Sequence, residues 1–173
     1  EILTTERPYF TRKQVQEHGR LGCEVKGKED REIKIADEIV GIKKWECEVV
    51  SNDNVATYIK EFVVKLPEGE FLDFVSGSYI QLDVPVVEID FKNDLYKIDE
   101  RFHDDYNKFK IWDLKMKNTD PVFRAYSMAN HPAEGNIIML NIRLATPPFD
   151  RKAGGFMNLN PGICSSYVFS RKP

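Results

Sequence analysis

The sequence has few cysteines, little excess charge and no long apolar run, and each shortage excludes a class of protein. Its three cysteines, Cys23, Cys47 and Cys164, lack the paired spacing of a disulfide framework or a zinc site, which favours a reducing compartment. The three histidines are scattered, without the spacing of metal ligands. A net charge of −3 argues against nucleic acid as a partner. No stretch approaches the roughly 20 apolar residues of a membrane-spanning helix, so we expect no direct membrane insertion.

The rest of the composition is typical of one folded domain with a short appendage. With 173 residues, 42% of them hydrophobic and 31% charged, the chain is long enough to bury a core and too short for two full domains. Its charged residues are spread along the chain, which argues against disorder. It begins at Glu1 and ends at Pro173, just after the first turns of an expected helix, so we expect a fragment of a longer polypeptide.

The apolar pattern predicts a mainly β protein. A short helix is expected over 11–18, because Thr11 and Gln14 fit a capping box. Alternating β patterns then recur with turn residues between them. The predicted strands cover residues 45–51, 57–66, 78–84, 122–128 and 137–144. About five or six short strands at this spacing favour a small antiparallel barrel.

Residues 86–120 interrupt this pattern with aromatic side chains set among many acids and lysines. A loop of that length without structure is unusual inside a compact domain. We expect the segment to fold over the barrel, with a short helix near 100–108, or else to serve as a docking surface.

Two short motifs carry the chemistry, Arg124-Ala125-Tyr126-Ser127 and Gly162-Ile163-Cys164-Ser165-Ser166. On one strand, Arg124 and Tyr126 share a face while Ser127 points to the other. Pro161-Gly162 is typical of a helix start, where backbone N–H groups and nearby hydroxyls meet a phosphate. A flavin dinucleotide requires a positive charge for its pyrophosphate, an aromatic ring and a phosphate site, and the two motifs offer these residue types. These residue types are common, so by themselves they are weak evidence.

Longer stretches around both motifs resemble the flavin domain of the ferredoxin-NADP reductase family. The likeness rests on Arg124-Ala125-Tyr126-Ser127-Met128-Ala129-Asn130 and on residues 141–148 and 161–167, and it extends upstream through 43–54 and 77–81. More narrowly, these stretches resemble the NADH-oxidising subunit of sodium-translocating NADH:quinone reductases. The resemblance implies a six-stranded antiparallel Greek-key barrel with a short helix at the phosphate site, and FAD as its cofactor.

In that family the arginine clamps the pyrophosphate, the tyrosine lies against the isoalloxazine, and the serine contacts the ring edge near the reacting nitrogen. The resemblance gives these roles to Arg124, Tyr126 and Ser127, so Tyr126 and Ser127 are the implied catalytic residues. The implied contacts to the adenosine and phosphates are Asn141, Ile142, Arg143, Gly162, Ile163, Cys164, Ser165 and Ser166. Tyr79 is a further candidate beside the flavin. A thiolate at Cys164 would be stabilised at a helix start, but we interpret this cysteine as a packing residue.

The front of the chain resembles the end of a plant-type ferredoxin domain. Residues 20–25 are similar to the segment that carries the fourth thiolate of a [2Fe-2S] cluster, which makes Cys23 an implied metal ligand. The loop with the other thiolates is missing, so the cluster is expected only in the intact subunit. The implied domains are a ferredoxin remnant over 1–40 and the FAD-binding barrel over 41–173, with an NADH-binding domain downstream.

The resemblance also implies a setting. Hydride passes from NADH to FAD, single electrons continue to the [2Fe-2S] cluster, and other subunits of the membrane complex couple ubiquinone reduction to sodium export. The intact subunit is expected at the cytoplasmic face of the bacterial inner membrane, anchored by an upstream helix, and the fragment alone is expected to be inactive with NADH. Two alternatives stay open: the reductase component of a bacterial multicomponent oxygenase, and a barrel without cofactor that serves as an interaction module.

Overall fold

The computed structural model describes Thr4, residues 7–19, Leu21 and residues 43–173, and the chain divides into two compact units, Glu1–Lys43 and Lys44–Pro173. In the first unit, η1 (Arg7–Tyr9) precedes α1 (Arg12–Gln16). The predicted capping box is present. Thr11 Oγ1 accepts from the backbone N–H of Gln14 at 3.3 Å, and Gln14 Oε1 accepts from the Thr11 N–H at 2.9 Å. α1 ends before the predicted residue 18, because His18 takes a left-handed φ of 60°.

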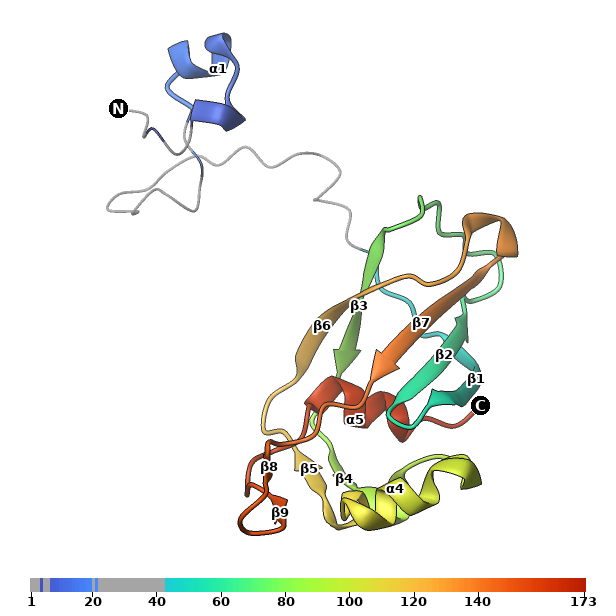
Figure 1. Ribbon diagram of the computed structural model, residues 1–173. Coiled ribbons are helices and arrows are strands. Elements are labelled where there is room, and N and C mark those ends of the chain that lie inside the picture. The colour runs from blue at the N-terminus through green and yellow to red at the C-terminus, as the bar shows by residue number, and fades with distance from the viewer. Residues whose placement is uncertain (1–3, 5–6, 20, 22–42) are drawn as a thin grey trace. The chain divides into compact units, whose positions relative to one another are not determined.

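The second unit is built from antiparallel sheets (Figure 1). Its nine strands are β1 (Glu48–Ala56), β2 (Ile59–Lys65), β3 (Tyr79–Val84), β4 (Glu88–Asp90), β5 (Lys115–Lys117), β6 (Val122–Ser127), β7 (Ile137–Arg143), β8 (Phe149–Asp150) and β9 (Gly155–Phe156). One sheet has the order β1-β2-β7, and the remaining strands pair as β3-β6, β4-β5 and β8-β9. The mainly antiparallel β prediction is therefore confirmed.

The predicted six-stranded Greek-key barrel is not confirmed by these sheets. Within the described part of the chain, the β1-β2-β7 sheet and the β3-β6 ribbon share no hydrogen-bonded ladder, and no closed barrel forms. Figure 1 shows the two side by side, with α5 (Ile163–Phe169) across the ends of β3, β6 and β7. Side-chain packing, α5 and a backbone hydrogen bond from the Ala129 N–H to the Met139 carbonyl at 2.7 Å join the two sheets in place of a continuous ladder.

A first core fills the space between this sheet and this ribbon. Its buried members include Phe62 and Val64 from β2 and Leu140 and Ile142 from β7, and the half-buried Tyr126 of β6 packs against them. The period of two along each strand places these side chains on the inner face. The residues expected to bind a ligand therefore stand at the edge of a packed core.

β1 lies further along the chain than the predicted strand 45–51. It continues through asparagines, which are depleted in strands, yet Asn52 and Asn54 are only 0% and 9% exposed. Asn52 Nδ2 donates to the carbonyl oxygens of Val168 and Arg171, both at 2.8 Å. These tertiary hydrogen bonds outweigh the low β propensity of asparagine.

The segment 86–120 is ordered and encloses a second core, as expected for a segment that folds over the domain. Its helices are α3 (Phe91–Asp94), η3 (Glu100–Phe102), α4 (His103–Lys108) and η4 (Ile111–Asp113), and a further short helix, η5 (Pro132–Glu134), lies outside it. The predicted helix near 100–108 is confirmed. Phe91 and Tyr106 are 0% exposed and share the second core with Phe169 of α5. The segment is thereby attached to the same helix that joins the two sheets.

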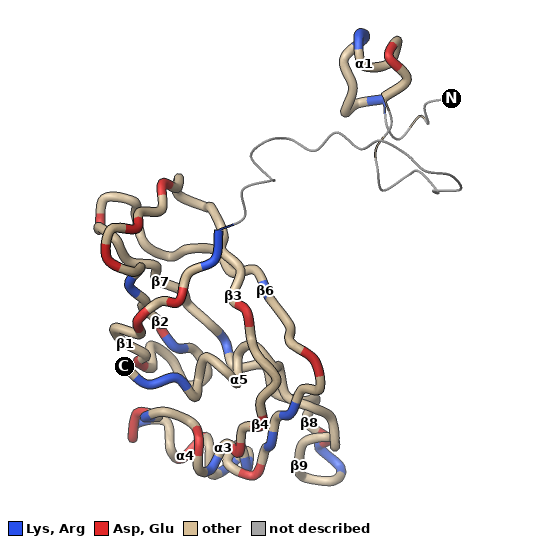
Figure 2. The backbone as a smooth tube through the Cα atoms, turned by 180° about the vertical axis from the view of Figure 1, so that it is seen from behind, with Lys and Arg blue, Asp and Glu red and all other residues tan. Residues whose placement is uncertain are grey.

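Charged side chains of this segment lie on its surface. Figure 2 shows basic and acidic residues mixed along α3, α4 and β4. Lys115 pairs with Asp90 at 2.9 Å and Lys117 with Glu88 at 3.0 Å across the β4–β5 ribbon. Ion pairs at the surface contribute little to stability, because water and salt screen the attraction between their charges. They form a solvated face rather than a source of the segment's stability.

Candidate functional site

A pocket of about 260 Å³ opens where β6, the end of β7 and the start of α5 meet. It collects residues from three stretches that are far apart in the sequence. The predicted site residues that line it are Arg124, Tyr126, Arg143, Gly162, Ile163, Cys164 and Ser165. Val122, Ala125 and Ala145 complete its wall. These three were not predicted to bind a ligand. Ala125 and Ala145 lie inside the stretches that resemble the family, whereas Val122 lies just before the first of them and carried no such signal.

The register of the β3-β6 ribbon shows how the side chains of the first motif are divided between its two faces. Tyr126 lies opposite Ile80, and Arg124 opposite Leu82, on the inner face. Ser127 lies opposite Tyr79 on the outer face, and Tyr79 is 66% exposed. The predicted division of the motif between two faces is confirmed. Ser127 and Tyr79 thus stand next to each other at the end of the ribbon, outside the pocket.

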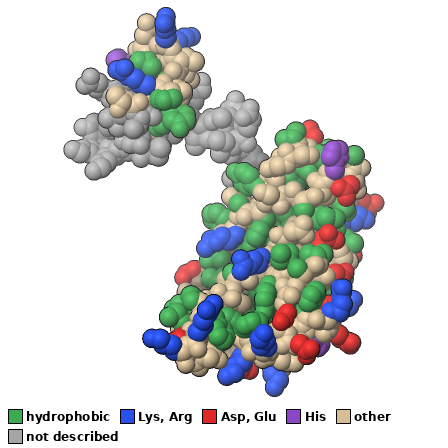
Figure 3. Space-filling view, viewed as in Figure 1, with side chains coloured by type: hydrophobic (Ala, Val, Ile, Leu, Met, Phe, Trp, Pro, Cys, Tyr) green, Lys and Arg blue, Asp and Glu red, His purple; other side chains and the backbone are tan. Residues whose placement is uncertain are grey.

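The pocket carries positive charge that nothing in the described fold neutralises. Arg124 Nη1 donates to the carbonyl oxygen of Phe123 at 2.8 Å. Both Arg124 and Arg143 are exposed, and among the described residues no carboxylate forms an ion pair with either guanidinium. On the face drawn in Figure 3, Lys and Arg side chains lie among hydrophobic ones over the β6 and β7 region. A pocket with two unpaired guanidinium groups suits an anion.

Gly162 lets the start of α5 approach the chain after β7. Its N–H donates to the Ala145 carbonyl at 2.8 Å. A Cβ at this position would lie 2.7 Å from the Ala145 Cβ and 2.8 Å from Ser165 Oγ, closer than side chains tolerate. Glycine is therefore required for close approach here, while its φ of −60° is open to any residue.

The two serines of the second motif are turned into the fold. The hydroxyls of Ser165 and Ser166 both donate to the Gly162 carbonyl, at 3.0 and 2.8 Å, and Ser165 Oγ accepts from the Ala145 N–H at 3.1 Å. Both side chains are buried. Their hydroxyl hydrogens are engaged in bracing the pocket, whereas the sequence suggested that they point at a phosphate.

Tyr126 and Cys164 meet at the inner wall of the pocket. Burial raises the pKa of the Tyr126 hydroxyl, and a hydrogen bond with Cys164 raises it further. Burial also raises the pKa of the Cys164 thiol, against the smaller lowering effects of Tyr126 and the Arg124 charge. Both groups are protonated at neutral pH. This favours Cys164 as a packing residue rather than a thiolate.

The remaining predicted residues lie away from the pocket. Asn141 is exposed on β7, and Ile142 is 0% exposed in the first core, where it supports the strand that carries Arg143. Cys23 lies outside the described residues, so its role as a cluster ligand stays a prediction. Within the described ranges, no group of three or more His, Cys, Asp or Glu side chains has the arrangement of a metal site. Over the same ranges, no helix has the length and apolar character needed to span a bilayer.

Comparison with known proteins gives a consistent set of relatives, although no family model matches the chain. It is 46% identical over all 173 residues to the F subunit of the Na(+)-translocating NADH-quinone reductase of Idiomarina loihiensis. Over 99% of its length it is 48% identical to the same protein of Psychrobacter arcticus and 44% identical to that of Colwellia psychrerythraea. It spans 41%, 40% and 54% of these relatives. The chain therefore belongs, along its whole length, to the family of the F subunits of Na(+)-translocating NADH-quinone reductases, and it corresponds to a part of such a subunit.

Proposed function

We propose that the chain is the FAD-binding part of an NADH-oxidising subunit in a sodium-translocating NADH:quinone reductase. The observation that carries this proposal is the pocket between β6, β7 and α5, where Arg124 and Arg143 have no acidic partner among the described residues. Two unpaired cations beside an apolar wall suit the pyrophosphate of a dinucleotide. The identity of 43–48% to the F subunits of such reductases supports the same function.

The size of the pocket indicates which part of FAD it takes. Its volume of about 260 Å³ is below the roughly 300–1,000 Å³ of pockets that enclose whole drug-sized ligands. We assign it to the pyrophosphate and its neighbouring atoms, held by Arg124 and Arg143. The isoalloxazine would then lie along Tyr126 toward the end of the β3-β6 ribbon, with its reacting edge at Ser127 and Tyr79 beside it.

The other predicted residues support these contacts. Asn141 and Ile142 belong to the strand that runs past the adenosine portion, and Gly162, Ile163 and Cys164 form the pocket floor at the start of α5. Ser165 and Ser166 hold that floor through the Gly162 carbonyl. When bound, FAD supplies hydride acceptance from NADH and one-electron release to a [2Fe-2S] cluster. The chain orients the cofactor through these contacts.

We assign residues 41–173 to a barrel of the ferredoxin-reductase type. The first core supports this, since side chains of the β1-β2-β7 sheet and the β3-β6 ribbon pack against each other as the two halves of a barrel would. Residues 1–40 are assigned to a ferredoxin remnant in which Cys23 ligates the cluster of the intact subunit. NADH would bind to another domain of that subunit, within the complex at the cytoplasmic face of the inner membrane.

A titration of the chain with FAD tests the proposal through quenching of flavin fluorescence. We expect saturable binding, and a loss of about tenfold or more in affinity for Arg124→Ala, the range for one charge-assisted hydrogen bond. Arg101→Ala removes the same charge from a residue that pairs with Asp99 at 2.7 Å outside the pocket, and it should bind like the parent. Absence of binding by the parent chain would refute the proposal and favour a cofactor-free interaction module.

A further inference from the structure

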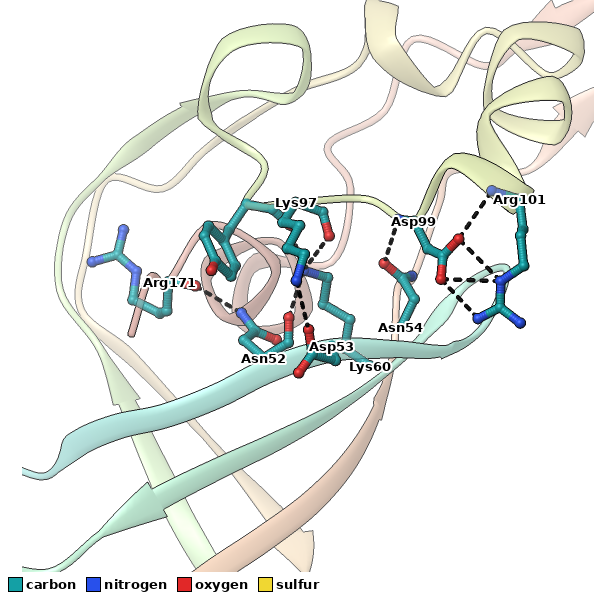
Figure 4. A network of polar contacts seen from close by, with 9 residues as sticks. Asn52, Asp53, Asn54, Lys60, Lys97, Asp99, Arg101 and Arg171 are labelled. Atoms are coloured by element: carbon teal, nitrogen blue, oxygen red, sulfur yellow. Dashed lines mark hydrogen bonds and ion pairs between the residues drawn. The ribbon is translucent and has the colours of Figure 1, made fainter.

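Lys60 of β2 is completely buried, at 0% exposure, which is rare for a lysine. Its Nζ donates to the carbonyl oxygens of Asn52 at 3.1 Å, of Lys97 at 3.4 Å, and of Tyr96. The rings of Tyr96 and Phe169 lie 5.2 and 5.5 Å from Nζ, within the range of cation–π attraction. Figure 4 shows the ammonium between β1 and the backbone near Lys97. One side chain therefore joins the β1–β2 hairpin to the segment 86–120.

Asn52 extends these contacts to the end of α5. Its Nδ2 donates to the carbonyls of Val168 and Arg171, both at 2.8 Å, and the Tyr96 N–H donates to the Phe169 carbonyl at 2.8 Å. The last carbonyls of a helix have no partner within the helix itself. The hairpin and the segment 86–120 donate to the Val168 and Phe169 carbonyls here, so they attach the last turn of α5.

Carbonyl dipoles, rather than carboxylates, hold the Lys60 ammonium. Asp53 on β1 is exposed, and its Oδ1 lies 3.6 Å from the Lys97 Nζ. Arg171, which carries the same positive charge as Lys60, stacks with its guanidinium 4.2 Å from the centre of the Tyr167 ring. Within residues 43–173, no carboxylate forms an ion pair with Lys60. These hydrogen bonds hold three backbone segments together: β1, the chain near Lys97 and the end of α5.

We propose that Lys60 and Asn52 are positioning residues for the candidate site. They hold the C-terminal end of α5, and the N-terminal end of the same short helix carries Ile163 and Cys164 into the pocket. A helix of seven residues is only about 10 Å long, so a shift at its end is carried to its start. The effect on FAD rests on the proposed function, whereas the position of α5 itself is measurable without flavin.

The test is the rate at which a thiol reagent modifies Cys164, which is 4% exposed, in the flavin-free chain. Peptide mass spectrometry separates Cys164 from the other cysteines. Lys60→Met removes every donor, and Lys60→Gln has the same length as Met but keeps two N–H donors. Lys65→Met is the matched control, because Lys65 is exposed on the same strand. Circular dichroism confirms that each variant is folded, and FAD affinity is measured on the same samples.

We expect Lys60→Met to raise the Cys164 modification rate roughly tenfold to hundredfold, with Lys60→Gln between Met and the parent and Lys65→Met unchanged. A rate for Lys60→Met within twofold of Lys65→Met, or equal rates for Met and Gln, would overturn the proposal. If Lys60→Met does not fold, Asn52→Ala is measured instead, and an unchanged rate there overturns it. Where the parent itself binds no FAD, the proposed function fails, yet the modification rates still decide the positioning role.

Discussion

Replacing Gly162 with alanine is expected to destabilise the chain by about 1–2 kcal/mol. The new Cβ would lie 2.7 Å from the Ala145 Cβ and 2.8 Å from Ser165 Oγ, and overpacking of this kind costs about 1–3 kcal/mol. Because the φ of Gly162 is −60°, alanine can adopt this backbone conformation without strain. Alanine also lowers the conformational entropy of the unfolded chain, which stabilises the folded state by about 0.4–1 kcal/mol. The overlap is the larger effect. The Gly162–Ala145 backbone hydrogen bond of 2.8 Å is the contact most directly disturbed.

Urea unfolding followed by circular dichroism measures this change. Gly155→Ala is the matched control, since a Cβ there meets nothing within 4 Å, and it should be neutral or slightly stabilising. Adding Ala145→Gly to Gly162→Ala removes the closest overlap and should recover most of the loss beyond the cost of Ala145→Gly alone. An unfolding midpoint for Gly162→Ala equal to that of the parent, or no recovery in the double variant, would refute the close-approach explanation.

Three further predictions concern residues outside the pocket. Burial lowers the pKa of Lys60 from 10.5 to about 8, so between these pH values the unfolded chain binds more protons than the folded chain. The free energy of unfolding should therefore rise with pH by roughly 2–3 kcal/mol. Urea titrations at pH 7.5 and 10 should show this rise in the parent and not in Lys60→Met. Leu140 is 0% exposed in the first core, so Leu140→Ala should lower the free energy of unfolding by about 3 kcal/mol in the same assay. A decrease of less than about 1 kcal/mol would contradict the packing described. Asn118→Ala removes the side-chain hydrogen bonds to the Val87 N–H at 2.9 Å, the Pro85 carbonyl at 3.0 Å and the Asp120 carbonyl at 2.7 Å. We expect the free energy of unfolding to fall by about 1–3 kcal/mol and the Val87 amide to exchange its hydrogen faster. An unchanged exchange rate at Val87 would disprove this prediction.

Local sequence predicted much of the secondary structure, because strand period and helix caps depend on neighbouring residues. The predicted strands at 57–66, 78–84, 122–128 and 137–144 overlap β2, β3, β6 and β7. The division of Arg124 and Tyr126 from Ser127 followed from the same period. Strand β1 was misplaced, since Asn52 is favourable in a strand only when the Val168 and Arg171 carbonyls accept its hydrogen bonds. Both acceptor carbonyls lie more than a hundred residues away along the sequence, so no local pattern could reveal them.

The order of the elements, the inner and outer faces of the strands, and the motifs that resemble a flavin domain can all be read from the amino-acid sequence. What the residues of those motifs touch follows from the fold. It turned the Ser165 and Ser166 hydroxyls toward the Gly162 carbonyl, kept Arg124 and Arg143 without acidic partners among the described residues, and buried Lys60 against three carbonyls. Hydrogen-bond direction and burial depend on segments that folding brings together, whereas periodicity reports only on neighbours along the chain.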